Sequence, residues 1–350
     1  MTARITVGIT STDRTRAILD GRIGIAGFEP ELRVDEPQPI FRAAQREAAL
    51  DVAELSLGTH LVQCDAGLAN YWAIPVFLSR AFRHNAVHVR TDRGIREPAD
   101  LNGRAIGIQG FQQTATIWVR GILAESYGFD PGSVRWVVGG LETPGDLERT
   151  ALHRPLALKA EPVPAGATLD GLLREGAIDA VISPAAPPSA RDLAVPVGPL
   201  FPDAPAEERR FHESTGLFPV MHVLGLSKAV AAANPGLAVA LFDAFASAKS
   251  RAQAELLRDN YLRTSLPWQA EAARQARRIM GPNPWRYGFA ENLAELQALI
   301  RHAARDGLVD PGLDPASLFH PATLALPDPD TPPAQASRAR AAAPSVSSPA

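Results

Sequence analysis

One short segment brings together residue types that bind organic acids and move protons. The stretch S-R-A-F-R-H at 79–84 contains Arg80, Arg83 and His84. Arginine binds a planar carboxylate through two parallel hydrogen bonds, and histidine exchanges protons near neutral pH. We therefore expect Arg80 and Arg83 to bind a substrate carboxylate and His84 to take part in proton transfer. A salt-bridged hinge is the structural alternative.

Other residues with acid, base or anion-binding chemistry lie beside predicted strands. Asp13 and Arg14 follow the first strand at the start of a helix, where free N–H groups attract anions. Glu54-Leu55-Ser56 ends a short apolar strand, where partial burial of Glu54 would raise its pKa and suit it to proton donation. His222 lies on a later strand as a second candidate for proton transfer. The alternatives are a helix cap, a solvated arginine, a surface glutamate and a hydrogen-bonded core histidine.

Two further segments could line a binding site. Gln113 and Thr114 open a helix after a glycine-containing turn, so backbone N–H groups and the side-chain amide there could bind a carboxylate. Tyr287 lies in the corner W-R-Y-G at 285–288, for which packing is the alternative. We expect all three residues to contact substrate.

Motifs for several other chemistries are absent from the sequence. There is no P-loop, no G-x-G-x-x-G after a strand, no G-x-S-x-G and no H-E-x-x-H. Cys64 is the single cysteine, which excludes an intrachain disulfide and a cysteine metal cluster. His84 and His88 would share one face of a strand, but the sequence has no third metal ligand at a spacing typical of a metal site. We expect neither a metal nor a cofactor.

Length and charge limit the class of protein. A chain of 350 residues is long enough for two domains, and a net charge of −3 does not point to a nucleic-acid partner. No apolar run approaches the roughly 20 residues of a membrane span. The first eight residues run into a strand without the pattern of a secretory signal. We expect a cytoplasmic protein without a membrane partner; a homo-oligomer is compatible with the sequence.

Strand and helix patterns alternate along most of the chain. Strands are predicted at 4–9, 31–35, 51–56, 73–77, 84–91, 104–108, 134–138, 178–182 and 217–227. The last of these can return to the first group of strands, and only helices are predicted after it. We therefore expect an α/β fold in which residues 1–83 and 220–322 form one lobe and 84–219 a second. Residues 323–350 are rich in Pro, Ala and Ser, and we expect them to be disordered.

Several of these segments, taken in order, resemble one enzyme family over roughly residues 4–320. They are D-R-T-R-A-I-L-D-G at 13–21, A-E-L-S at 53–56, A-I-P-V-F-L-S-R-A-F-R-H at 73–84, Q-T-A at 113–115, G-G-L-E at 139–142, T-G-L-F-P-V-M-H at 215–222, L-P-W at 266–268 and W-R-Y-G at 285–288. The chain is similar to the 4,5-dihydroxyphthalate decarboxylases. The resemblance implies a type II periplasmic-binding-protein-like fold, with a ligand cleft between two lobes. Thr12, Q-G-F-Q at 109–112 and S-P-A-A-P at 183–187 depart from the family pattern, so part of the pocket wall is expected to differ.

The resemblance also implies a reaction and roles for the candidate residues. A dihydroxylated aromatic dicarboxylate would lose one carboxylate without oxidation or cofactor, giving protocatechuate and CO2. An arginine would hold the remaining carboxylate, a histidine would take the phenolic proton, and an acid would protonate the ring. The candidates for these three roles are, in turn, Arg14, Arg80 or Arg83; His84 or His222; and Glu54 or Asp13.

Two alternatives to this enzyme stay open. The first is a non-catalytic substrate-binding protein for aromatic acids that serves an ABC-type importer. The second is a pyrimidine-forming enzyme of the same fold, which would favour a site rich in His and Cys. The single Cys64 argues against the second alternative.

Overall fold

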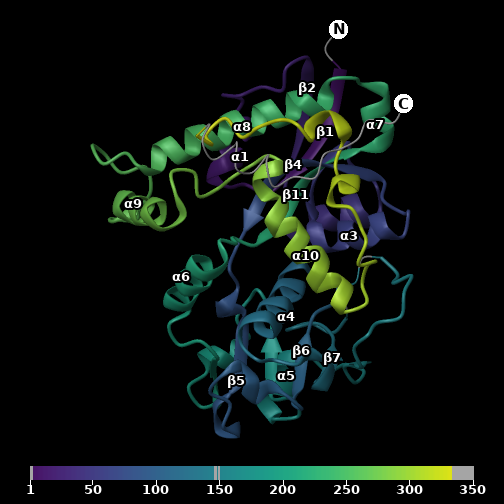
Figure 1. Cartoon of the computed structure of the whole chain (residues 1–350), viewed down its shortest axis with the longest axis vertical. Coiled ribbons are helices and arrows are strands. Elements are labelled where there is room, and N and C mark those ends of the chain that lie inside the picture. The colour runs from purple at the N-terminus through teal and green to yellow at the C-terminus, as the bar shows by residue number, and fades with distance from the viewer. Residues whose placement is uncertain (1–2, 146–147, 149, 333–350) are drawn as a thin grey trace.

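Two β-sheets flanked by helices build the molecule, one above the other in the view of Figure 1. The structure is a computed structural model, and it describes residues 3–145, 148 and 150–332. The first sheet has the strand order β2-β1-β3-β11-β4 and the second has the order β10-β5-β9-β6-β7-β8. The expected two-lobed α/β fold class is confirmed. The lobe boundaries between 83 and 84 and between 219 and 220 stay a prediction.

The first sheet combines strands from the start of the chain with one strand that returns much later. Its strands are β1 (Ala3–Ile9), β2 (Phe28–Val34), β3 (Val52–Ser56), β4 (Tyr71–Arg80) and β11 (Val220–Ser227). β11 lies between β3 and β4 and is antiparallel to both, whereas β1 is parallel to β2 and β3. All five residues of β3 are buried, as expected for a central strand covered on both faces.

Seven helices of the described residues belong to the same part of the chain as this sheet. They are α1 (Asp13–Leu19), α2 (Pro37–Phe41), α3 (Leu57–Asp65), α7 (Lys228–Ala233), α8 (Leu237–Leu256), α9 (Gln269–Met280) and α10 (Leu293–Arg305). α1 begins where Thr12 and Thr15 form a capping box, which satisfies free N–H groups of the first turn. None of the described helices is long and apolar enough to cross a membrane.

The strands of the second sheet are shorter than those of the first, and its central strands are mostly parallel. Its strands are β5 (Val87–Arg90), β6 (Ala105–Ile108), β7 (Arg135–Val138), β8 (Ala160–Pro162), β9 (Ala180–Ile182) and β10 (Val197–Pro199). Its helices are α4 (Thr114–Ser126), α5 (Leu169–Glu175) and α6 (Ala204–Thr215). β5 runs antiparallel to β9 and β10, so the chain enters this sheet against the direction of its neighbours.

The predicted strand at 84–91 is shorter than expected. Only Val87–Arg90 forms a strand, and His84–Ala86 form a 3-10 turn. The cause is Arg83, whose φ of 74° lies in the left-handed region that side chains other than glycine rarely adopt. The chain therefore bends between the two sheets, and Arg80 and His84 do not share one strand.

α4 connects the second lobe firmly to the first. The Trp118 indole donates a hydrogen bond to the Val220 carbonyl at 2.8 Å, and Arg120 pairs with Asp306 at 2.7 Å with both side chains fully buried. α10 packs along α4 in the middle of the molecule (Figure 1). Gly121 permits this contact, since a Cβ atom there would lie 2.0 Å from the His302 ring.

The expectation of a disordered tail from residue 323 is wrong for residues 323–332. Thr323 ends a 3-10 turn, and Asp328 is buried with its carboxylate bonded to Lys249. The composition of this segment does not reveal that it has an apolar contact surface and a buried carboxylate. Together these contacts offset the conformational entropy that is lost when the segment is ordered. Residues 333–350 lie outside the described residues.

Candidate active site

Glu54 and His222 form the central pair of the site. They lie on the adjacent antiparallel strands β3 and β11, where His222 is opposite Ser56 and Leu224 is opposite Glu54. This diagonal arrangement places both side chains on one face of the sheet. The His222 Nδ1 atom lies 2.6 Å from Oε1 of Glu54, and the backbone N–H of Thr10 donates to Oε2 at 3.0 Å.

The contacts of Glu54 decide its protonation. Burial raises the pKa of Glu54, but the hydrogen bond and charge of His222 and the N–H of Thr10 outweigh it, so the pKa falls below its ordinary value. The predicted rise in this pKa is therefore wrong, because the sequence did not reveal the two donors. An ionised carboxylate only accepts hydrogen bonds, so Nδ1 of His222 carries a proton, and Nε2 is the ring nitrogen that remains for exchange with a substrate.

The start of α4 lies directly against the end of β3. The hydroxyl of Thr114 is 3.1 Å from the Ser56 hydroxyl and accepts a hydrogen bond from the Gly58 N–H at 2.8 Å. A Cβ atom on Gly58 would lie 2.4 Å from the Gln112 carbonyl oxygen, so glycine is needed for this approach. Residues of both lobes thus meet two residues away from Glu54.

The turn before α4 already binds a carboxylate of the protein itself. The backbone N–H groups of Phe111 and Gln112 donate to the two carboxylate oxygens of Glu148, the second at 3.4 Å. Gly110 lies against the same carboxylate, where a Cβ atom would be 3.0 Å from Oε1. The side-chain oxygen of the following Gln113 is buried without a hydrogen-bond partner among the described residues. This turn has the donors that an aromatic carboxylate needs.

Arg14 is held in place by three neighbours. Asp13 accepts a hydrogen bond from its Nη1 at 2.7 Å, the Leu78 carbonyl accepts one from Nη2 at 3.0 Å, and the guanidinium lies 3.9 Å from the centre of the Trp285 ring. Its Nε is buried and has no acceptor within the part of the chain that the structure describes. Arg14 is therefore oriented and still has a donor to offer, and Asp13 serves to hold it.

Tyr287 lies behind Arg14 and is fully buried. Burial raises the pKa of the Tyr287 hydroxyl well above its usual value, although the nearby charge of Arg14 acts against this rise. The hydroxyl has no hydrogen-bond partner among residues 3–145, 148 and 150–332. Tyr287 is consequently a neutral, buried group near Arg14, and its expected contact with substrate stays a prediction.

Arg80 lies in the interior, which corrects the expectation that it faces a ligand. Its guanidinium is fully buried and is bonded to groups from three loops or helices. The acceptors are the Phe218 carbonyl at 2.8 Å, the Arg286 carbonyl at 2.7 Å and the Asn292 side-chain oxygen, with the Glu295 carboxylate at 3.8 Å. Burial lowers the pKa of Arg80 to about 10, against the opposing charge of Glu295. Arg80 therefore stays charged near neutral pH and fixes the surrounding chain.

His84 lies apart from Glu54 and His222, beside residues of α4 and α6. Its Nε2 is 3.1 Å from the Tyr127 hydroxyl, which in turn donates to Glu207 at 2.7 Å, and Phe201 and Phe211 pack around the ring. Burial lowers the pKa of His84 to about 4. The structure gives His84 no contact with the Glu54–His222 pair among the described residues.

Arg83 lies beside His84 and not beside the Glu54–His222 pair. Arg83 and His84 line a small cavity with Val119, Ile122 and Leu123 of α4, more than one helical turn beyond Thr114. His88 is also buried, and no group of three His, Cys, Asp or Glu residues in the described chain could hold a metal ion.

Three residues of the site were missed from the sequence. They are Thr10, which binds Glu54; Phe41, whose ring meets His222 edge-on at 4.8 Å; and Glu148. Thr10 could have been found, because it directly follows β1, and β3, the strand that carries Glu54, is the parallel neighbour of β1. Glu148 lies in a long irregular segment, where no sequence pattern signals its contact.

Comparisons with known proteins agree with the fold and identify the family. No family model matches the chain. The chain is 41% identical over 322 residues to a 4,5-dihydroxyphthalate decarboxylase from Comamonas testosteroni, covering 92% of this chain and 97% of the relative. It is 42% identical over 183 residues to a 4,5-dihydroxyphthalate decarboxylase from Pseudomonas putida, covering 52% of this chain and 71% of the relative.

Among solved structures, the fold is similar to the periplasmic sulfonate-binding protein SsuA from Methylobacillus flagellatus KT. The TM-score is 0.50 at 13% identity, with 92% of each chain covered. The aliphatic sulphonate binding protein SsuA from Escherichia coli gives a TM-score of 0.44 at 13% identity, with 80% of each chain covered. The first of these likenesses supports the type II periplasmic-binding-protein-like fold. The near-complete match to the Comamonas protein supports more: the chain belongs to the 4,5-dihydroxyphthalate decarboxylase family.

Proposed function

We propose that this protein is a carboxy-lyase that converts 4,5-dihydroxyphthalate to protocatechuate and CO2 without oxidation. Family membership supplies the substrate class. The observation that carries the chemistry is the 2.6 Å contact between the buried carboxylate of Glu54 and His222. A histidine oriented by a carboxylate is a general base whose protonated form is stabilised at the moment it forms.

His222 begins the reaction by taking the proton of the hydroxyl group para to the leaving carboxylate. The electron pair on that oxygen moves through the ring to the carbon that bears the carboxylate, and this carbon takes up a proton. The bond to the carboxylate then breaks, CO2 leaves, and its electron pair restores the aromatic ring. His222 returns its proton to the phenolate oxygen, so the net reaction consumes one proton from solvent.

The proton for the ring carbon needs a donor other than Glu54. The lowered pKa of Glu54 keeps it ionised and suits it to orienting His222 instead. Of the two acids expected from the sequence, Asp13 is left for this role: its Oδ1 accepts from Arg14 at 2.7 Å, and its other oxygen would carry the proton. Asp13 is partly exposed, with a side-chain accessibility of 44%, so it can exchange protons with solvent.

Two groups are proposed to hold the carboxylate that remains on the ring. Arg14 offers its unpartnered Nε from the first lobe. The turn before α4, with Gln113 and Thr114, offers backbone N–H groups from the second lobe. Its hydrogen bonds to Glu148 support this assignment, since they show the turn binding a carboxylate. Glu148 would have to leave when substrate enters.

A direct assay tests the proposal. Purified protein is incubated with 4,5-dihydroxyphthalate, and CO2 and protocatechuate are measured together, with and without a chelator. Equal amounts of both products, formed by wild type and lost in His222→Asn, are expected. Tight binding of the dicarboxylate with no CO2 release would instead favour a substrate-binding protein. The cytoplasmic location is part of the same proposal, and cell fractionation tests it.

A further inference from the structure

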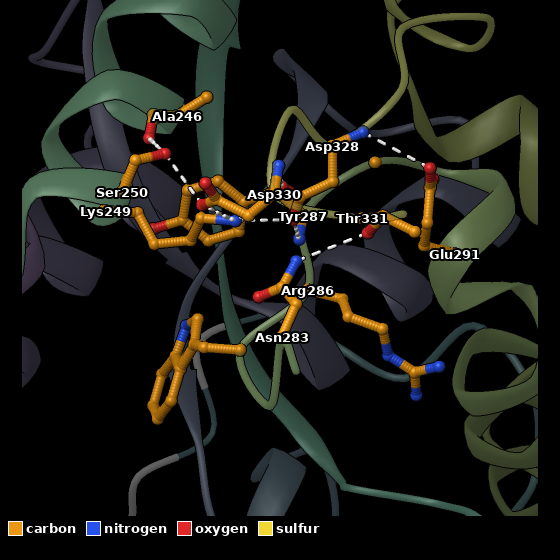
Figure 2. Close-up of polar contacts among 12 residues, drawn as sticks. Ala246, Lys249, Ser250, Asn283, Arg286, Tyr287, Glu291, Asp328, Asp330 and Thr331 are labelled. Carbon is orange, nitrogen blue, oxygen red and sulfur yellow. Dashed lines mark hydrogen bonds and ion pairs between the residues drawn. The ribbon is translucent and has the colours of Figure 1, made fainter. Parts of the chain in front are cut away.

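A buried ion pair fastens the C-terminal strap, which we define as residues 321–332. The Nζ atom of Lys249 on α8 lies 2.6 and 2.5 Å from the two carboxylate oxygens of Asp328, and 3.1 Å from Asp330. The Ser250 hydroxyl donates to Asp330 at 2.7 Å. Figure 2 shows Asp328 between Lys249 and Ser250 on one side and Glu291 on the other. The side chains of Lys249 and Asp328 are both fully buried.

The same carboxylate also fixes the chain at the W-R-Y-G corner. The backbone N–H of Tyr287 donates to Asp328 at 2.5 Å, and the N–H of Asp328 donates to Glu291 at 3.2 Å (Figure 2). The Asn283 amide reaches Thr331 at 3.3 Å. The strap therefore holds the backbone at 283–287 through these contacts.

The corner is in turn the support for Arg14 and Arg80. The Arg14 guanidinium stacks on Trp285 at 3.9 Å, and Arg80 donates to the Arg286 carbonyl at 2.7 Å. Three successive residues thus meet Arg14, Arg80 and Asp328. A shift of the corner would move the aromatic surface on which Arg14 rests.

We infer that Asp328 is a positioning residue that sets the place of Arg14 through the Tyr287 N–H and Trp285. This inference rests on the proposed function, in which Arg14 binds the carboxylate that stays on the ring. Misplacement by a fraction of an ångström weakens a directional hydrogen bond such as the one proposed from the Arg14 Nε atom. Loss of the Asp328 contact should therefore raise KM for 4,5-dihydroxyphthalate while kcat, which depends on His222, changes little.

Two double variants separate positioning from simple stability. Removing only one member of a buried pair leaves an unpaired charge and destabilises the fold, so both charges are removed together. Lys249→Met with Asp328→Asn keeps an acceptor for the Tyr287 N–H, whereas Lys249→Met with Asp328→Ala does not. We expect KM to be about tenfold higher in the alanine double variant than in the asparagine one, with kcat within about twofold. Equal KM values in two folded double variants would overturn the inference.

Arg14→Lys distinguishes this inference from the proposed function. If Arg14→Lys leaves KM unchanged, the proposed role of Arg14 fails. If it raises KM, the alanine double variant should add little further effect in the Arg14→Lys background, because both changes disturb the same contact. Full additivity would overturn the positioning role alone.

A milder variant covers the case in which the alanine double variant does not fold. Asp330→Ala with Ser250→Ala loosens the strap and leaves the Lys249–Asp328 pair intact. We expect KM to rise about two- to threefold at unchanged kcat. An unchanged KM in this folded variant would overturn the inference as well.

Discussion

His222 and His84 are each connected to a glutamate, but the first contact is direct and the second passes through Tyr127. His222 touches the carboxylate of Glu54 at 2.6 Å, whereas His84 meets the Tyr127 hydroxyl, which binds Glu207. A direct carboxylate stabilises a protonated ring, and a tyrosine hydroxyl between aromatic side chains does not. The same residue types therefore suit His222 to the proposed proton transfer and make His84 a packing residue.

The largest expected difference is in turnover. His222→Asn should lower kcat by about 100- to 10,000-fold, the usual contribution of general acid–base catalysis. The matched variant His84→Asn should leave kcat within about threefold, since His84 has no described contact with the site. CO2 release under saturating substrate measures both. A large loss in the His84 variant, with His222→Asn near wild type, would reverse our assignment.

The next effect concerns stability and pH. The pKa of His84 is about 4 in the folded protein and 6.5 in the unfolded chain. Between pH 4 and pH 6.5 the unfolded chain therefore binds a proton that the folded protein does not. The free energy of unfolding should thus fall as the pH falls from 6.5 to about 4, by up to about 3 kcal/mol from this residue. His84→Phe, which keeps the aromatic packing, should flatten this dependence in urea titrations. The same slope in variant and wild type would show that His84 is protonated in the folded protein.

The two glutamates offer a third comparison. Glu54→Gln keeps the size of the side chain but removes the charge that stabilises protonated His222, so kcat should fall by about 30- to 100-fold. Glu207→Gln, at the end of the His84 chain, is the control and should have little effect on kcat. Steady-state rates across pH measure both variants. Comparable losses in the two would mean that the chain through Tyr127 also serves catalysis.

The smallest effect separates Arg14 from Arg83, two arginines whose Nε atoms are buried without an acceptor among the described residues. Arg14→Lys keeps the charge but loses the planar fork, and KM should rise about tenfold. Arg83→Lys, beside His84, should change KM less than about twofold. Binding of phthalate by calorimetry gives the same comparison without turnover. If Arg83→Lys weakened binding more, the sequence-based assignment of Arg83 to the substrate would stand.

The sequence predicted the fold better than the site. Alternating strand and helix patterns and the late strand at 217–227 led to the correct fold class, because burial on a sheet leaves a regular trace in the residue types. Glu54 and His222 were nominated separately, but they are 168 residues apart and their contact depends on the register of β3 and β11. Nothing local to either residue reports that register.

Local sequence patterns gave wrong predictions where a residue's position depends on the backbone conformation or on hydrogen-bond acceptors far along the chain. Arg80 and His84 are four residues apart and would share a face of a strand, but the left-handed conformation of Arg83 ends that alternation. Arg80 also finds its acceptors at Phe218, Arg286 and Asn292, all far along the chain. Asp328 was missed for a similar reason. The composition around it is typical of disorder and does not reveal that its carboxylate binds a buried lysine.

The central place of β11 has a consequence for how the chain folds during synthesis. β3 and β4 leave the ribosome with no strand between them, and Phe218, just before β11, follows Arg80 by 138 residues. At about 5–20 residues per second, this gap stays open for roughly 7 to 28 s. The edges of two buried strands are unpaired throughout that time, which is a known route to aggregation. We expect the newly made N-terminal part to need a chaperone, and the second lobe to fold before the first is complete.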